Sequence, residues 1–290
     1  MAGLSDYLAE FAIEFASGQQ PVPAIGNRFL ALFTTAPTSD AGTGGTEVSG
    51  GAYARVQIAG AVAATASFTT ASPNITMTTN PGWVVPGMNV YDLTNGKQIG
   101  TVSTYVGTAL VLTANAANAS SGAADSLQFS AFPAAAASSG TEPSVTPSNA
   151  ANGAVITFAQ ATASWGTVTS WGIYDAVTAG NLLWWDYLGN FKWLPFSGTS
   201  ASPSVLTAPA HGYANGDPVV VTAKFGGTLP ATAGSWAGVL TVAGAATDSF
   251  NVGVNSTGTG DGEVRKIVQQ PIAANVTASF AASAFTLSMA

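Results

Sequence analysis

The segment WGTVTSWGIYDAVTAGNLLWWDYLGNFKWLPF, residues 165–196, says most about the fold. Two runs within it, residues 168–174 and 182–188, are rich in the aromatic and β-branched residues that favour strands. Residues 175–181 between them have the Asp, Gly and Asn content of a turn. We therefore expect two strands joined by a turn.

Further strands are expected on both sides of this segment. Residues 28–35, 53–58 and 155–158 are β-rich and bounded by turn-forming residues, and residues 285–289 alternate with a period of two. This strand spacing and turn chemistry favour an all-β fold with an antiparallel β-sandwich or jelly-roll core.

One N-terminal segment has a helical pattern instead. Its apolar residues recur at the spacing of one helix face: Leu4, Leu8, Phe11 and Phe15. Ser5 suits the N-cap, and Gly18 suits the C-terminal stop. A helix this short needs packing to be stable. We expect it to pack on its own domain, and the alternative is docking on a neighbouring subunit.

Low-complexity runs divide the chain. AAAASSG at residues 134–140 and SGTSAS at residues 197–202 have the composition of linkers. We expect a core sandwich that is interrupted by two small inserted β-domains. The core comprises residues 1–60 with the helix, 147–196 and 267–290, and the insertions comprise residues 61–146 and 197–266.

The two insertions follow a similar plan. Residues 86–90 correspond to 215–221 as a Gly-containing loop that leads into a strand, and residues 109–112 correspond to 239–242 as a middle strand. The dipeptide Asp-Ser precedes a strand in residues 125–129 and again in residues 248–252. Duplication and convergent patterning of small β-domains both account for this match.

Residue types that serve catalytic and metal sites are scarce. The chain has one histidine, His211, and no cysteine. A Ser-His-Asp triad would have to use this histidine without a G-x-S-x-G elbow, and a zinc site would lack ligands. Asp175 and Asp186 are the best candidate pair of catalytic carboxylates, but Asp175 lies in a turn composition. We expect no enzymatic activity, no catalytic or metal-binding residue and no cofactor.

The charge content favours a permanent assembly. Charged residues make up 7% of the chain, against about 25% in typical soluble domains. A surface this poor in charge does little to keep copies apart. The seven Lys and Arg residues are spread singly, which argues against nucleic-acid binding. Without a basic leader or a long apolar run, we expect synthesis in the cytoplasm and no membrane segment.

Tryptophans in the segment 165–196 are candidates for an interface. Consecutive strand side chains point to opposite faces of a sheet, so Trp184 and Trp185 cannot both face one core. One of them must cover an insertion, meet another subunit or present an exposed platform. Together with Trp193 they form our candidate subunit or partner interface, and a glycan-stacking platform is the alternative.

Two opposite charges flank a Gly-Gly turn. Glu47 and Arg55 lie on either side of Gly50 and Gly51. They could pair as exposed charges and brace the loop, or they could be two separate solvated side chains.

Five motifs occur in order along the chain: FLALFTTAPT at 29–38, GTEVSGGAYARV at 45–56, ITFAQAT at 156–162, WGTV at 165–168 and GIYD at 172–175. In combination they resemble a family of tailed-bacteriophage and prophage virion structural proteins, known as tail, fibre-like or decoration-type proteins. The resemblance covers residues 1–58, 150–195 and 267–290. Residues 208–230 resemble a small module repeated in other phage structural proteins, and the first insertion has no such resemblance.

The resemblance implies a structural component of the virion, exposed on the particle at the tail, neck or capsid surface, and it implies no catalytic residues. We expect assembly through β-rich, charge-poor interfaces with copies of the chain, as a trimer, and with other virion proteins. A host-glycan-binding adsorption module of a phage fibre is the alternative function. A depolymerase that uses Asp175 or Asp186 is the weakest hypothesis.

Overall fold

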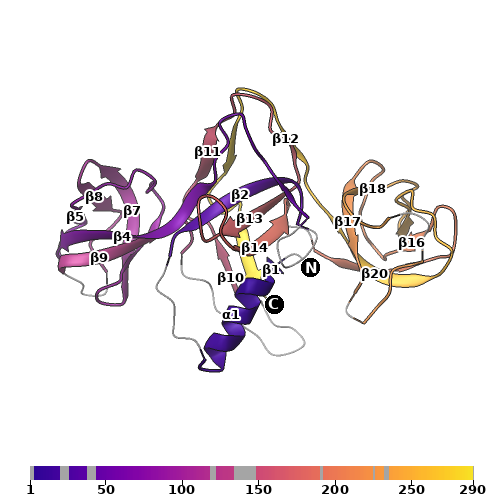
Figure 1. The fold of residues 1–290 in the computed structure, drawn as a ribbon, viewed down its shortest axis with the longest axis horizontal. Helices are drawn as coiled ribbons and strands as arrows, with labels where there is room; N and C mark the ends of the chain where they lie inside the picture. Colours follow the sequence, from indigo (N-terminus) through magenta and orange to yellow (C-terminus); the bar gives the residue numbers. More distant parts are fainter. Residues whose placement is uncertain are drawn as a thin grey trace.

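Short antiparallel strands make up most of the structure, with one helix near the N-terminus (Figure 1). The computed structural model describes residues 3–19, 26–37, 44–117, 122–133, 148–189, 192–224, 226–231 and 235–289. The all-β class predicted from the sequence is confirmed. The predicted linker at 134–140 lies outside the described residues.

The N-terminal segment forms a strand before it enters the helix. β1 (Gly3–Leu4) pairs in the central sheet, and α1 (Asp6–Ala16) follows it. The Ser5 hydroxyl accepts a hydrogen bond from the Leu8 backbone N–H at 3.2 Å, which confirms Ser5 as the N-cap. The prediction that Leu4 belongs to the helix face is wrong, because its backbone pairs in the sheet and it precedes the cap.

A central antiparallel sheet joins segments from both halves of the chain. Besides β1 it contains β2 (Arg28–Thr35), β3 (Thr46–Glu47), the start of β4 (Val56–Phe68), β13 (Ser170–Tyr174) and β14 (Leu182–Tyr187). The order is β1-β14-β13-β2-β4, and β3 also pairs with β2. The two strands expected on either side of residues 175–181 are confirmed as the β13–β14 hairpin.

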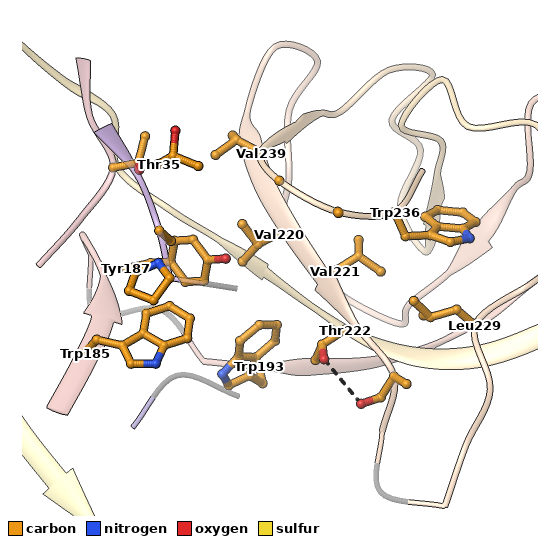
Figure 2. Close-up of a pocket in the computed structure, with 16 residues that line it drawn as sticks. Thr35, Trp185, Tyr187, Trp193, Val220, Val221, Thr222, Leu229, Trp236 and Val239 are labelled. Carbon is orange, nitrogen blue, oxygen red and sulfur yellow. Dashed lines mark hydrogen bonds between the residues drawn. The ribbon is translucent and has the colours of Figure 1, made fainter. Parts of the chain in front are cut away.

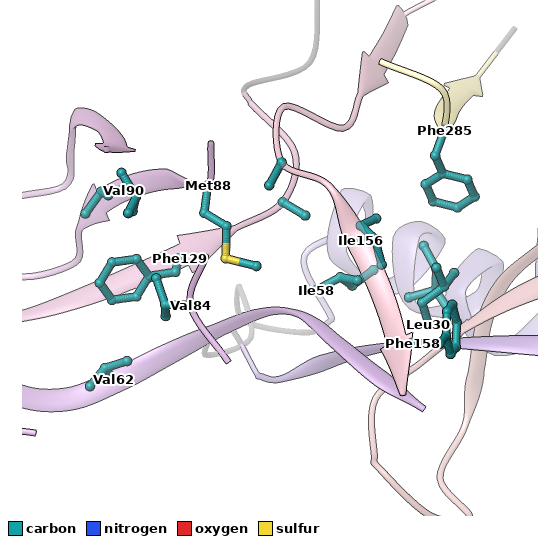
Figure 3. Close-up of a cluster of buried hydrophobic side chains, with 14 of the residues drawn as sticks. Leu30, Ile58, Val62, Val84, Met88, Val90, Phe129, Ile156, Phe158 and Phe285 are labelled. Carbon is teal, nitrogen blue, oxygen red and sulfur yellow. The ribbon is translucent and has the colours of Figure 1, made fainter. Parts of the chain in front are cut away.

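Two-stranded ribbons pack against one face of this sheet. They are β10 (Ser148–Ala151) with β23 (Thr286–Met289), β11 (Ile156–Gln160) with β22 (Thr277–Phe280), and β12 (Gly166–Val168) with β21 (Gln270–Ile272). Phe158 and Phe285 from this side share a buried cluster with Leu30 of the sheet (Figure 3). Among the described residues the ribbons do not pair into a second continuous sheet, so the sandwich or jelly-roll topology stays a prediction.

The strands between the two halves of the core close into a ring, which we call the first barrel. It contains β4, β5 (Asn74–Thr76), β6 (Asn89–Asp92), β7 (Lys97–Val106), β8 (Ala109–Leu112) and β9 (Gly122–Ser130). The pairing runs β4-β5-β8-β7-β6-β9 and returns to β4. Because the ring is closed, its strands have no free edge.

A second ring, the second barrel, follows β14. It contains β15 (Leu194–Gly198), β16 (Leu206–Thr207), β17 (Pro218–Thr222), β18 (Leu240–Thr241), β19 (Ser249–Phe250) and β20 (Gly260–Lys266). The pairing runs β18-β17-β20-β15-β16-β19, and a bridge between Ala243 and Asn251 closes it. The segment predicted as a linker at 197–202 begins inside β15, so this part of the prediction is wrong.

The two barrels have the same strand order. When the strands of each are counted along the chain, both rings run first, second, fifth, fourth, third, sixth. Backbone hydrogen bonds also match. The Gly87 N–H donates to the Val102 carbonyl at 2.8 Å, and the Gly216 N–H donates to the Val242 carbonyl at 2.9 Å. The two barrels are therefore alike in topology and in local geometry.

This common order corrects the strand correspondences drawn from the sequence. Residues 86–90 and 215–221 do lead into the third strand of each barrel, β6 and β17. The other two correspondences are wrong. Residues 109–112 form the fifth strand while 239–242 include the fourth, and the two Asp-Ser dipeptides mark the sixth strand in one barrel and the fifth in the other.

The barrels differ in how their interiors connect to the core. Side chains inside the first barrel, such as Phe129 and Val90, belong to the same buried cluster as Leu30 and Phe158 of the core, with Met88 between them (Figure 3). The second barrel has a cluster of its own, which includes Leu206 and other side chains: Phe196, Val219, Trp236, Phe250 and Val264. The second barrel therefore meets the core along its outer surface only.

Candidate functional site

The β13–β14 hairpin places its aromatic side chains on both faces of the central sheet. Trp184 is half-buried and packs against the main hydrophobic cluster, on the side of α1 and Leu8. Trp185 is only 4% exposed and lies on the other face, in a cluster with Phe33 and Leu182. The expectation that these two tryptophans face opposite sides is confirmed.

Between this second face and the second barrel lies a cleft of about 420 Å³ (Figure 2). On the core side, Trp185, Tyr187 and Trp193 line it with aromatic rings. On the barrel side, Val220 and Val239 line it with branched aliphatic side chains. The Trp185 and Tyr187 rings meet edge to face, with centroids 5.5 Å apart. We call this feature the aromatic cleft.

A buried ion pair connects the two walls of the aromatic cleft. Arg265 of β20 forms a two-pronged salt bridge with Asp186 of β14, and one of its hydrogen bonds measures 3.1 Å. The guanidinium also lies over the rings of Trp193 and Tyr187, at 4.8 and 5.5 Å from their centroids. Burial is the main reason that the pKa of the Tyr187 hydroxyl is raised, so this group is a neutral donor at physiological pH.

Buried polar atoms near the aromatic cleft are unsatisfied. Within the described part of the chain, no hydrogen-bond partner exists for the indole N–H of Trp185 or the hydroxyl of Ser170. Ser170 pairs directly with Tyr187 across the hairpin, so the two side chains share a sheet face. Buried groups of this kind nearly always have a partner. Of the two residues, only Trp185 is among those that line the aromatic cleft.

The predicted interface residues are thus only partly brought together. Trp185 and Trp193 line the same cleft, while Trp184 lies on the opposite sheet face. Phe191, an aromatic residue of the same segment 165–196, lies outside the described residues. Sequence reasoning missed the barrel wall with Val220 and Trp236, because nothing local connects these residues to the hairpin.

The helix that was predicted as a docking element is mostly exposed. No residue of α1 is buried among those described. Leu8 packs against the main cluster and Phe11 is half-buried, but Phe15 is 47% exposed and Ile13 is 70% exposed. The structure therefore leaves an apolar helix surface uncovered. Whether it docks on a neighbour stays a prediction.

The two carboxylates proposed as a catalytic pair have separate structural partners. Asp175 accepts hydrogen bonds from the backbone and side-chain amide of Asn181 at 2.7 and 2.8 Å, as in a turn. Asp186 binds Arg265. His211 is buried in the second barrel, where its Nδ1 accepts a hydrogen bond from the Tyr213 backbone N–H at 2.9 Å.

The described residues contain neither a candidate metal site nor a membrane-spanning helix. Residues 3–19, 26–37 and the other described ranges hold no group of three or more His, Cys, Asp or Glu side chains able to bind a metal ion. Within the same ranges, no helix has the length and apolar character needed to cross a membrane.

Glu47 and Arg55 form the predicted pair, but the pair is not exposed. Arg55 donates to both carboxylate oxygens of Glu47, at 2.9 and 2.7 Å, and its side chain is only 8% exposed. It also donates to the carbonyl oxygens of Ala176 and Ala179 and lies 3.5 Å from the centroid of the Tyr174 ring. The pair therefore ties the Gly-Gly loop to the β13–β14 turn.

Comparison with known protein families identifies the family to which the chain belongs. The family model described as "Podophage GP4 fiber I protein gp80" matches residues 3–131 and 89–195. The chain belongs to this phage tail-fibre family. It is therefore a structural protein of a phage virion, as the sequence motifs implied. A comparison with curated proteins finds no match.

The extent of the family match separates the two barrels. The matched residues include α1, the central sheet strands β2, β13 and β14, and the whole first barrel. For this barrel the sequence motifs had given no resemblance. The match ends at residue 195, and the second barrel begins at Leu194. Apart from Leu194 and Pro195, the second barrel lies outside the matched region, and with it one wall of the aromatic cleft.

Proposed function

We propose that this protein is an exposed, non-enzymatic subunit of the fibre, assembled with copies of itself and with other virion proteins. The match of a phage fibre family to residues 3–131 and 89–195 carries this proposal. The low charge content of 7% supports it, because a permanent interface needs no repulsive surface. The protein would be made in the host cytoplasm and join the particle from there.

The proposed arrangement is a core with two inserted domains, residues 61–146 and 197–266, displayed outward. The two barrels extend from opposite sides of the central sheet (Figure 1). The closed rings favour display, because a barrel without free strand edges does not add strands to its neighbours. The central sheet and α1 remain for assembly.

Helix α1 is the proposed contact with a neighbouring copy, and a trimer is the expected state. Phe15 lies on the helix face predicted for docking and Tyr7 lies beside it, while Ile13 is exposed on the opposite side of the helix. Such surfaces on a charge-poor chain mark protein–protein contacts. The helix projects from the body of the molecule, where another subunit can reach it (Figure 1).

Light scattering after size-exclusion chromatography tests the assembly. We expect a mass that is a multiple of 28.9 kDa, most simply three copies. The double change Ile13→Asp and Phe15→Asp should reduce the mass to that of one chain and prevent incorporation into particles. The matched control is Val106→Asp, a 76% exposed apolar residue at the end of β7, which should change neither. A monomeric parent that never joins particles would contradict the proposal.

A further inference from the structure

The aromatic cleft has the size and lining of a small-molecule site. Its volume of about 420 Å³ lies in the range of roughly 300–1,000 Å³ that is usual for such pockets. Figure 2 shows the rings of Tyr187 and Trp193 facing Val220 across the opening. Both rings are half-buried, so part of each remains accessible. A flat, weakly polar ligand can therefore stack between the two walls.

One fixed polar group in the lining of this cleft lacks a partner. Trp185 is 4% exposed, yet its indole N–H has no hydrogen-bond partner in the described ranges. The side chain packs in a cluster with Phe33 and Leu182, which holds the donor in place. An indole N–H can only donate. A ligand with a hydroxyl oxygen can accept this hydrogen bond.

No charged side chain is among the described residues that line the cleft. Arg265 is paired with Asp186 and covered by the Trp193 and Tyr187 rings. Lys224, next to the barrel wall, lies 3.5 Å from the carboxylate of Asp261. The described lining therefore favours a neutral ligand.

We propose that the aromatic cleft binds a neutral pyranose ring of a glycan. The C–H face of the sugar stacks on Trp193 and Tyr187, and the indole N–H of Trp185 donates to a sugar hydroxyl oxygen. The proposal adds a ligand to the exposed fibre subunit proposed above and rests on that exposure, but not on the number of copies in the assembly.

Binding of neutral oligosaccharides to the full chain tests this proposal. The probe is an immobilised panel of oligosaccharides built from glucose, galactose, mannose or rhamnose, followed by tryptophan fluorescence titration with those that bind. Trp193→Ala should weaken binding at least tenfold because the stacking platform is lost. Trp185→Phe keeps a ring but removes the N–H, and it should weaken binding several-fold.

A matched control separates loss of the site from loss of the fold. Trp83 is also half-buried, and its ring packs edge to face on Phe129 of the first barrel. It is not among the residues that line the cleft. Trp83→Phe should leave binding unchanged, and circular dichroism should show all three variants folded.

Three outcomes overturn the proposal: no oligosaccharide binds at millimolar concentration, both cleft variants bind as well as the parent, or Trp193→Ala abolishes self-association, which would place a second copy in the cleft. Incorporation into particles, measured separately, reports on the fibre role. A protein that joins particles without binding sugars refutes the site alone.

Discussion

The first and second barrels have the same strand order but are attached to the core in different ways. The interior of the first is continuous with the core cluster, whereas the second has an interior of its own and faces the core across the aromatic cleft. Closing a ring satisfies the backbone of every strand regardless of what lies outside it. The same barrel can therefore be fused to a core or attached beside it, and side chains decide which.

Strand length and small residues explain the fusion of the first barrel. β4 has 13 residues, so one strand serves both the central sheet and the ring. At the junction, Gly87 comes so close to the core that a Cβ there would lie 2.7 Å from the Gly153 carbonyl oxygen. The equivalent Gly216 of the second barrel has open space at this position. In the second barrel, the Arg265–Asp186 pair links the ring to the sheet.

The largest effects are expected from removing one buried aromatic ring from the interior of each barrel. Phe129→Ala and Phe250→Ala remove rings that are at most 1% exposed, and each should lower the free energy of unfolding by about 3–5 kcal/mol. In the first barrel the loss should reach the central sheet, because the cluster is shared. In the second it should stay local. Hydrogen exchange resolved by peptide measures this.

The two variants should therefore differ in which strands exchange faster, rather than in how much unfolding free energy they lose. Phe129→Ala should raise exchange in β4, β9 and β2 together, and Phe250→Ala should raise it in β15–β20 while β2 and β13 stay protected. Equal loss of protection in the central sheet for both would show that the two barrels are coupled to the core alike.

The next largest effect concerns the link between the second barrel and the sheet. Asp186→Asn leaves the buried Arg265 charge without its counter-ion, which should cost about 3 kcal/mol. The second barrel should also detach more readily from the hairpin, so limited proteolysis between β14 and β15 should accelerate. Asp175→Asn is the control, because that half-buried carboxylate has Asn181 as its hydrogen-bond partner in a turn and no ion pair among the described residues. Equal proteolysis of both variants would contradict the assigned role of the pair.

A smaller effect separates two equivalent glycines. Both have a positive φ, +88° at Gly87 and +92° at Gly216, so replacement by Ala strains the backbone by about 1–3 kcal/mol at either site. Gly87→Ala also collides with the Gly153 carbonyl, so it should destabilise more than Gly216→Ala. Thermal unfolding measures the difference. Equal melting temperatures would mean that the close approach at Gly87 does not restrain the first barrel.

The smallest effect is a difference in pH dependence. Burial and the neighbouring Asp92 raise the pKa of Asp125 in the first barrel. Its contribution to stability is present below the ordinary carboxyl pKa of about 3.9 and is lost as the pH rises through the raised value. In the second barrel, burial opposes ionisation of Asp217, but the Ala214 backbone N–H and the Lys266 ammonium outweigh it and lower the pKa.

Asp217 therefore stabilises the fold above the ordinary carboxyl pKa, and this contribution is lost as the pH falls through the lowered value. Asp125→Asn should raise the melting temperature at neutral pH, while Asp217→Asn should lower it. Melting curves at pH 7 measure both signs. Shifts in the same direction would remove this distinction between the barrels.

The sequence by itself determined the local features of this protein. β-rich runs bounded by turn residues predicted β2 and the β13–β14 hairpin, the Ser5 hydroxyl predicted the helix start, and the composition around Asp175 predicted the turn in which it binds Asn181. Each depends on residues a few positions apart, whose geometry follows from backbone dihedrals and side-chain chemistry.

Only the tertiary structure decided which strands meet. In the first barrel β8 pairs with β5, and its counterpart in the second barrel is β19 rather than β18. Strand pairing joins segments that are far apart in the chain, so no local pattern predicts it. The same holds for the cleft. Alternation predicted that Trp184 and Trp185 face opposite sides, but the wall opposite Trp185 comes from β17 and its neighbours, more than thirty residues away. Side-chain direction is local, whereas the surface it meets depends on the whole chain.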